Sequence, residues 1–183
     1  MRIARLVDEP DRDALPPAIE EIFFATSAVR SFADRRARDA FKERWLGRYL
    51  AHYAQNFFVA RAGAGAAGEP IGYLAGCLES PALNPRFEDI GFYRVFAPLC
   101  AFYPSHLHVN VVEPWRSRGI GAQLIAAFAA QALQSNSPGM HIVTDHAARN
   151  VRFYQRNAFR ILSTQCCSGS TLVFMGRQLA APG

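Results

Sequence analysis

The sequence predicts one domain of the α/β class, in which strands and helices alternate along the chain. Its 183 residues are close to the usual size of a single domain. Half of the residues are hydrophobic and 19% are charged, which is enough apolar material for a packed core. The same balance excludes a disordered polar chain. We therefore expect a single mixed α/β domain over residues 1–183.

The first part of the chain predicts a strand followed by two helices. Weak alternation of apolar residues indicates a strand over Arg2–Val7. Apolar residues at helical spacing indicate helices over Asp11–Ala25 and Asp34–Tyr53. We expect both helices to cover the core.

A β-hairpin and an insertion follow. Two runs rich in β-forming residues, Asn56–Arg61 and Ile71–Leu78, flank the glycine-rich stretch Ala62–Pro70, which is typical of a hairpin. The segment Glu79–Pro104 is bounded by prolines and carries more aromatic residues than a surface loop would. We predict that it is an inserted helix that packs on the fold and walls a pocket.

The rest of the chain predicts alternating strands and helices that end in two strands. The expected elements are a strand over His106–Val112, a helix over Gly119–Leu133 with Leu124, Ile125, Phe128 and Leu133 facing inward, a strand over Met140–Thr144, a helix over Ala147–Asn157, and strands over Phe159–Ser163 and Thr171–Met175.

The chain is basic, with a net charge of +5 and 20 basic residues, of which only Lys42 is lysine. Its pI of about 9.3 is in the range where nucleic-acid binding is considered. The arginines are dispersed and no nucleic-acid-reading motif is present, so we do not expect a nucleic-acid partner. The longest apolar runs are too short to span a membrane and no signal peptide is evident, so we expect a cytoplasmic protein without a membrane partner.

Cysteine and histidine spacing predicts neither disulfides nor a metal site. The adjacent pair Cys166–Cys167 is not a CxxC motif, and the other two cysteines are isolated. His106, His108, His141 and His146 lack matching cysteine or carboxylate spacing for zinc.

Residues 111–122, VVEPWRSRGIGA, lie between a predicted strand and a predicted helix and have the features of a phosphate-binding turn. Gly119 and Gly121 remove side chains where backbone N–H groups at a helix start can approach an anion. Arg116 and Arg118 add guanidinium groups beside them. The Rossmann fingerprint lacks its third glycine here and a P-loop lacks its lysine, so neither motif applies. A pyrophosphate fits these features.

Arg116–Gly121 matches the [QR]xxGx[GA] signature of the GNAT superfamily of acetyl-CoA-dependent N-acetyltransferases, which this sequence therefore resembles. Val111–Pro114 is similar to the end of that family's fourth strand, and Asn150–Phe159 resembles its second signature. Within the family, His106–Asn110 and Gly139–Ile142 are similar to a subgroup that includes the acetyltransferase-like domain attached to O-GlcNAc hydrolases.

The resemblance implies a central twisted mixed sheet of about six to seven strands with helices on both faces, and acetyl-CoA as co-substrate. It implies that amides around Val111 and Val112 pair with the pantetheine arm where this strand splays from the next. The implied cofactor-binding positions are Val111, Val112, Arg116, Arg118, Gly119, Ile120, Gly121, Ala122, Asn150 and Phe153.

For catalysis the resemblance implies Tyr154 as the general acid that protonates the departing thiolate. The sequence does not single out the general base, and both His108 and Asp145 are candidates. His108 has a suitable ordinary pKa, whereas Asp145 could instead cap the following helix. The family usually has an asparagine where Ala147 stands and a glycine where Ala158 stands.

The predicted activity is transfer of an acetyl group to a primary amine, such as an antibiotic, a polyamine, an amino acid, or a protein lysine or N-terminus. The alternative is an acyl-CoA-binding regulatory module without transfer activity. We expect the first two helices and the segment Glu79–Pro104 to line the acceptor side. The basic surface favours an acidic or carboxylated acceptor, and a homodimer is compatible with the resemblance.

Overall fold

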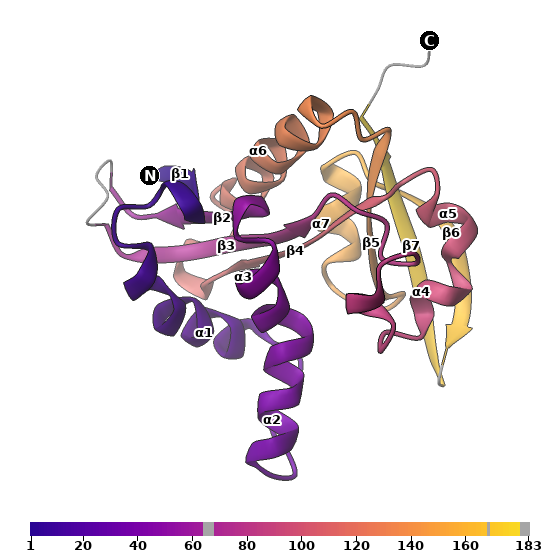
Figure 1. The fold of residues 1–183 in the computed structure, drawn as a ribbon, viewed down its shortest axis with the longest axis horizontal. Helices are drawn as coiled ribbons and strands as arrows, with labels where there is room; N and C mark the ends of the chain where they lie inside the picture. Colours follow the sequence, from indigo (N-terminus) through magenta and orange to yellow (C-terminus); the bar gives the residue numbers. More distant parts are fainter. Residues whose placement is uncertain (64–67, 168, 180–183) are drawn as a thin grey trace. The chain divides into compact units, whose positions relative to one another are not determined.

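The computed structural model describes residues 1–63, 68–167 and 169–179, which include a seven-stranded mixed sheet (Figure 1). The strand order is β1-β2-β3-β4-β5-β7-β6. Strands β4 and β5 are parallel, whereas the pairs β1–β2, β2–β3, β5–β7 and β6–β7 are antiparallel. This confirms the predicted fold class. The strands are β1 Arg2–Arg5, β2 Phe57–Arg61, β3 Pro70–Cys77, β4 Ser105–Val111, β5 Gly139–Asp145, β6 Arg160–Cys167 and β7 Ser170–Gln178.

The chain divides into two compact units, which we describe separately. The first unit comprises Met1–Gly76 and His108–Phe128, and the second comprises Cys77–Leu107 and Ala129–Gly183. Strand β4 and the helix α6 (Ile120–Gln134) each contribute residues to both units.

Helices in the first unit form where the sequence predicts them. Helix α1 (Leu15–Thr26) has Pro16 and Pro17 in its first turn, where the missing N–H groups cost nothing. Asp34 caps the next helix by accepting the Ala37 N–H at 2.7 Å. The other helical segments are η1 Leu6–Asp8, η2 Arg12–Ala14, α2 Arg35–Lys42, the π-helical segment η3 Glu43–Gly47, α3 Arg48–His52 and η4 Ala54–Asn56.

One strand and one helix of the first unit differ from the sequence prediction in where they end or how they wind. The first strand ends at Arg5, because Leu6–Asp8 turn into a 3-10 helix. The helix predicted over Asp34–Tyr53 is one continuous helical rod in which a π-helical turn joins α2 to α3 (Figure 1). The periodicity of the sequence indicates the rod but not the extra residue that a π turn accommodates.

The predicted β-hairpin is confirmed. Strands β2 and β3 pair in antiparallel register, with Val59 opposite Tyr73. Phe57 stacks on Tyr73 with ring centroids 5.2 Å apart, and both side chains are buried in the core of the first unit. The predicted loop Ala62–Pro70 contains residues 64–67, which lie outside the described part of the chain.

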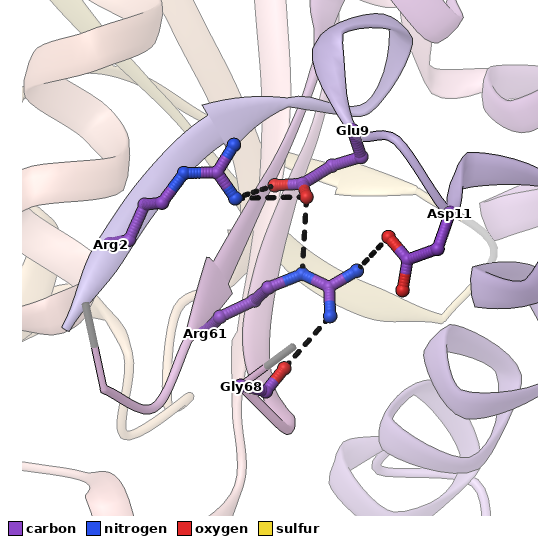
Figure 2. A network of polar contacts seen from close by, with 5 residues as sticks. All are labelled: Arg2, Glu9, Asp11, Arg61 and Gly68. Carbon is purple, nitrogen blue, oxygen red and sulfur yellow. Dashed lines mark hydrogen bonds and ion pairs between the residues drawn. The ribbon is translucent and has the colours of Figure 1, made fainter. Parts of the chain in front are cut away.

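A partly buried ion network anchors β1 to this hairpin (Figure 2). Arg2 donates to both carboxylate oxygens of Glu9 at 2.9 Å, and the Arg61 guanidinium lies 3.3 Å from the same carboxylate. Arg61 also donates to Asp11 at 2.5 Å and to the carbonyl of Gly68 at 2.8 Å. The hydrogen bond from Arg61 holds the pKa of Asp11 below its ordinary value. Glu9 and Arg61 are buried, and because each has a partner of opposite charge their charges can be accommodated there.

The inserted segment of the second unit contains three short helical turns instead of the single predicted helix. They are η5 Pro85–Phe87, α4 Phe92–Val95 and α5 Ala97–Cys100. Pro98 cannot donate a backbone hydrogen bond to a continuing helix and instead lies in the first turn of α5. Phe87, Tyr93 and Phe96 are buried as expected, whereas Phe102 is 68% exposed. Phe87 packs edge-on against His106 with ring centroids 4.7 Å apart.

Helix α6 confirms the predicted element, with one correction on its inward face. Leu124, Ile125 and Phe128 are buried, but Leu133 is 51% exposed. Ala132 is fully buried instead, because at 100° per residue it continues the stripe of Ile125 and Phe128, whereas Leu133 does not. Among the described residues no helix is long and apolar enough to cross a bilayer.

The carboxyl-terminal elements differ in length from the prediction. Helix α7 begins at Val151, not at Ala147, because a turn occupies the preceding residues. Strands β6 and β7 pair over most of their length and are longer than the predicted Phe159–Ser163 and Thr171–Met175. All the strands and main helices that the sequence predicts are nevertheless present.

Candidate active site

The turn between β4 and α6 has the backbone shape that its glycine predicts. After a short 3-10 turn, η6 (Glu113–Trp115), Ser117 and Gly119 adopt φ angles of +60° and +78°. A φ of +78° is in the left-handed region, which favours glycine at position 119. The chain therefore turns sharply and enters α6 at Ile120.

The first turn of α6 presents unpaired amides. Gln123 N–H bonds back to the carbonyl of Gly119 at 3.1 Å, so the three preceding amides, those of residues 120–122, have no acceptor within the helix. The helix dipole adds partial positive charge at the same point. Gly121 is helical, where glycine costs about 0.5–1 kcal/mol relative to alanine. A close approach of an anion to the backbone would give a reason for glycine at this position.

Two guanidinium groups flank this turn. Arg116 is exposed, and its Nε donates to the carbonyl of Val111 at 3.0 Å, which leaves its terminal N–H groups outside this bond. Arg118 is also exposed and lies over the ring of Trp115, with its guanidinium carbon 5.0 Å from the ring centroid. Amides, dipole and guanidinium groups together fit a pyrophosphate.

The backbone at the end of β4 corrects one expectation. The N–H of Val112 donates to the carbonyl of Ile71 in β3 at 3.0 Å, so it is not free for a pantetheine arm. The parallel ladder between β4 and β5 pairs Ser105 with Met140 and His106 with His141, at the start of β4. Val111 lies at the other end of this strand and is half-buried.

In the second unit, Tyr154 lies on α7 and is held by the way this helix ends. The N–H of Phe159 bonds to the carbonyl of Tyr154, and the N–H of Ala158 bonds to that of Gln155, both at 3.1 Å. These bonds form a Schellman motif, which requires a left-handed residue after the helix. Ala158 has φ +65° and fills that place. Tyr154 is 5% exposed and packs against the rings of Phe159 and Phe153 at 5.4 and 5.1 Å.

The left-handed Ala158 gives a direct stability prediction. Glycine adopts this conformation without the Cβ clash that costs an L-residue about 1–2 kcal/mol. Ala158→Gly should therefore raise the free energy of unfolding by about 1 kcal/mol, offset in part by the greater entropy of the unfolded glycine chain. Urea unfolding would measure the change. Ala148→Gly, a change in the preceding turn at a residue without a positive φ, is the control and should stabilise nothing.

Asp145 and Asn150 hold the turn before α7. The Asp145 carboxylate accepts the N–H of Ala147 at 2.8 Å and is exposed, so it caps a turn and not the helix itself. The side-chain carbonyl oxygen of Asn150 accepts a hydrogen bond from the Thr144 hydroxyl at 3.1 Å. Asn150 occupies the N-cap position of α7 without a capping bond from its side chain.

His108 lies among aromatic side chains of the first unit. Its Nε2 is 3.2 Å from the hydroxyl of Tyr49, and the ring of Trp45 meets the imidazole edge-on at 5.4 Å. Burial first, and the Arg48 guanidinium second, lower the pKa of His108 to about 4. The imidazole is therefore neutral at pH 7 and able to accept a proton, although it is a weaker base than an ordinary histidine.

The lowered pKa of His108 predicts a pH-dependent stability. In the unfolded chain the pKa of histidine is about 6.5, so between pH 6.5 and 4 the unfolded state binds a proton that the folded state does not. Stability should therefore fall as pH drops through this window, by about 2 to 3 kcal/mol in total. Urea unfolding at pH 7 and pH 4.5 should show this loss in the native protein and not in His108→Gln. His146→Gln, at an exposed histidine, should retain it.

Residues 53–161, more than half of the chain, match the model of the acetyltransferase (GNAT) domain family. The chain belongs to the GNAT acetyltransferase family. Its GNAT fold is also similar to that of the crystal structure of SsHAT, with a TM-score of 0.73, 21% identity, and coverage of 98% of each chain. The likeness extends over the length of this chain and shows the fold.

Two further solved structures have a similar fold. Naa20 from Chaetomium thermophilum, crystallised with a bisubstrate analogue, matches 97% of this chain and 86% of its own, with a TM-score of 0.59 and 18% identity. The yncA protein from Salmonella typhimurium, solved with its cofactor acetyl-CoA, matches 100% and 96%, with a TM-score of 0.59 and 18% identity.

Two other histidines, His106 and His141, form part of the core of the second unit. The His141 ring stacks on Phe174 at 4.5 Å, and its Nδ1 bonds to the carbonyl of Tyr103 at 2.5 Å. His106 lies 5.7 Å from His141, measured between ring centroids. Within the described part of the chain, no three histidine, cysteine or acidic residues are grouped to hold a metal ion.

The structure places the predicted residues in two sets, one in each unit. The first unit holds His108 and the turn with Arg116, Arg118 and the start of α6, and the second unit holds Asp145, Asn150, Phe153 and Tyr154. Sequence reasoning missed Tyr49 and Trp45 as neighbours of His108. Their helical spacing only indicated a buried face, so no signal in the sequence pointed to the histidine.

Proposed function

We propose that this GNAT protein transfers an acetyl group from acetyl-CoA to a primary amine by direct attack on the thioester. The start of α6 carries the proposal, because its unpaired amides, Gly121 and two flanking arginines fit the pyrophosphate of CoA. The N–H of Val112 is already bonded to Ile71 and is left out of the proposed CoA contacts. The positions that would hold CoA are the remaining backbone groups of Val111 and Val112, together with Arg116, Arg118, Gly119, Ile120, Gly121, Ala122, Asn150 and Phe153.

The chain supplies an acid and a base for this reaction. Acetyl-CoA supplies the acetyl group and a thiol leaving group. An alkylamine with a pKa near 10 must lose a proton to act as a nucleophile. The ammonium form would lose that proton to water, and His108, neutral at pH 7, would accept the further proton that the amine nitrogen gives up as it bonds to the acetyl carbon. Tyr154 would donate a proton to the departing sulfur. Asp145 is the alternative base, but its carboxylate already accepts a backbone N–H in a turn.

The first unit contains a cavity suited to an acidic or carboxylated acceptor. The open cavity of about 500 Å³ follows the end of α1, and its volume is that of an ordinary small-molecule site. Three guanidinium groups line it against one carboxylate. Its lining residues are Phe24, Val29, Arg30, Ser31, Phe32, Asp34, Arg35 and Arg38. Aromatic and guanidinium groups favour a substrate that carries both an apolar part and a carboxylate.

Helix α1, which leads into this cavity, is tied to the strand that carries His108. The Asn110 amide donates to the Thr26 hydroxyl at 2.5 Å, and that hydroxyl donates to the carbonyl of Ile22 at 2.6 Å. Residues of the inserted segment line a second cavity of about 410 Å³, within the second unit, through Leu99, Phe102, Tyr103, Pro138, Leu162 and Gln178.

An amine panel with a readout for free thiol tests the proposed reaction. The panel includes polyamines, an aminoglycoside, amino acids, peptides with free N-termini, and lysine-containing peptides. Release of CoA that depends on one amine is the expected result, and acceptors with a carboxylate should react faster than their amides. Saturable acetyl-CoA binding without CoA release from any amine would instead support a regulatory acyl-CoA-binding module.

Several finer assignments belong to the same proposal. The similarity of His106–Asn110 to the subgroup with the O-GlcNAc hydrolase-attached domain favours a place near that subgroup. The single-domain organisation over residues 1–183, with 79–104 as an insertion, and action in the cytoplasm stay predictions. So does a homodimer, which sedimentation in the presence of acetyl-CoA would test.

A further inference from the structure

Two aromatic residues of one helical rod enclose the imidazole of His108. The rings of Trp45 and Tyr49 lie 5.4 and 5.5 Å from the imidazole centroid, and each meets it at 86°. Tyr49 is fully buried, whereas Trp45 and His108 are partly exposed. The imidazole is thus held from two sides by rings of the same helical rod, within a residue that is partly exposed.

The rod has an unusual local geometry at this place. Trp45 lies within the π-helical turn Glu43–Gly47, and Tyr49 lies in the first turn of α3 that follows. π-helical turns are rare in proteins, but those that occur are often found at functional sites. The inserted residue redirects the side chains on one face of the helix. Here Trp45, inside the π-helical turn, and Tyr49, just after it, both pack against the ring of His108.

One hydrogen bond fixes the orientation of the imidazole. His108 Nε2 lies 3.2 Å from the Tyr49 hydroxyl, and within the described ranges this is the ring's one hydrogen bond. The partner of one ring nitrogen decides which nitrogen carries the proton in the neutral ring. A tyrosine oxygen can accept from Nε2–H, and Nε2–H is also the tautomer that free histidine prefers. Both effects leave the lone pair on Nδ1.

We propose, on the basis of the acetyl transfer proposed above, that Tyr49 is a positioning residue that holds His108 as the Nε2–H tautomer, so that Nδ1 accepts the proton of the attacking amine. As the amine nitrogen bonds to the acetyl carbon, its N–H bond breaks and the electron pair stays on that nitrogen. The proton passes to Nδ1, and the resulting imidazolium releases it to water. The C–S bond of the thioester breaks as the tetrahedral intermediate collapses, and the sulfur leaves with its electron pair and takes a proton from the general acid proposed above. No oxidant or reductant is needed.

The chemistry around the ring agrees with this role. Burial and the Arg48 guanidinium favour the neutral ring, which is the form that has a lone pair to offer. A positive group beside His108 also disfavours an ammonium ion there, so the amine would arrive near the ring in its neutral, nucleophilic form. The hydroxyl of Tyr49 adds what burial alone cannot, namely a choice between the two nitrogens.

The test compares the native protein with Tyr49→Phe, which keeps the ring packing and removes the hydroxyl. Nitrogen-15 spectra of ring-labelled histidine at pH 7 should show His108 as the Nε2–H tautomer in the native protein and as a mixture of tautomers in Tyr49→Phe. In the amine assay, kcat should fall about 5- to 10-fold with KM for the amine unchanged. Tyr53→Phe, which removes another buried hydroxyl of the same segment, should change neither reading.

Two spectroscopic results would overturn the proposal. One is an Nδ1–H tautomer in the native protein, which can be read even if the variant fails to fold. The other is an Nε2–H tautomer that stays the same in a folded Tyr49→Phe. Because the spectra need no turnover, a failure of the proposed acetyl transfer would be seen separately, as an absence of CoA release while His108 keeps its tautomer.

Discussion

Gly121→Glu is expected to weaken acetyl-CoA binding at least 100-fold, about 2.8 kcal/mol, while the protein stays folded. The substitution puts a carboxylate beside the three unpaired amides at the start of α6, where the pyrophosphate would lie. The carboxylate would occupy those donors and repel the phosphates. The same change should stabilise the helix, because glycine costs about 0.5–1 kcal/mol in a helix and an acidic residue is favourable in its first turn.

Weaker acetyl-CoA binding together with equal or higher stability distinguishes a lost anion site from a variant that binds poorly because it is unfolded. Titration calorimetry with acetyl-CoA gives the affinity, and thermal unfolding without ligand gives the stability, which should rise or stay constant. Gly91→Glu is a matched control, because it introduces the same charge at an exposed glycine with open space around it. It should bind acetyl-CoA as the native protein does.

The exposed Arg116 can be tested in the same series. Arg116→Ala removes the guanidinium beside the turn together with its bond to the carbonyl of Val111. In the double variant with Gly121→Glu, binding should be undetectable by calorimetry. Unchanged binding in the double variant would contradict the placement of the pyrophosphate and, with it, the proposed function.

The backbone of the turn between β4 and α6 could be predicted from the sequence because its properties are local. A glycine with φ +78° and a second glycine in the first helical turn depend on a few neighbouring residues, and so does the charge of Arg116 and Arg118. Hairpin pairing and the order of strands and helices were predicted for the same reason. Each follows from periodicity or from turn residues that are close in the chain.

The environment of His108 could not be predicted, because it depends on contacts between residues far apart in the sequence. Tyr49 precedes His108 by 59 positions, and a π-helical turn directs the helix residues that meet the imidazole. The ordinary pKa of histidine suits a general base, whereas burial and Arg48 make His108 a weaker base. Likewise, the hydrogen bond from Val112 to Ile71 depends on the pairing of β3 with β4.

Tyr154→Phe is expected to lower kcat by about 10²- to 10³-fold, the usual contribution of a general acid, without changing the affinity for acetyl-CoA. The hydroxyl is the group that would protonate the departing thiolate, and phenylalanine removes it alone. The ring would keep its contacts with Phe153 and Phe159, and the backbone bonds that end α7 do not involve the side chain. Stability should therefore change by no more than about 1 kcal/mol.

A thiol-release assay with the best amine of the panel measures kcat, and calorimetry measures the dissociation constant for acetyl-CoA. Tyr103→Phe is the control, since it removes a tyrosine hydroxyl elsewhere in the second unit and should leave kcat as it is. If Tyr154→Phe turned over within threefold of the native rate, Tyr154 would be a packing residue of α7 and not the acid. If kcat fell only because the affinity for acetyl-CoA fell, the hydroxyl would bind the substrate. The general-acid role requires a loss of rate at unchanged affinity, because only an interaction formed in the transition state separates the two measurements.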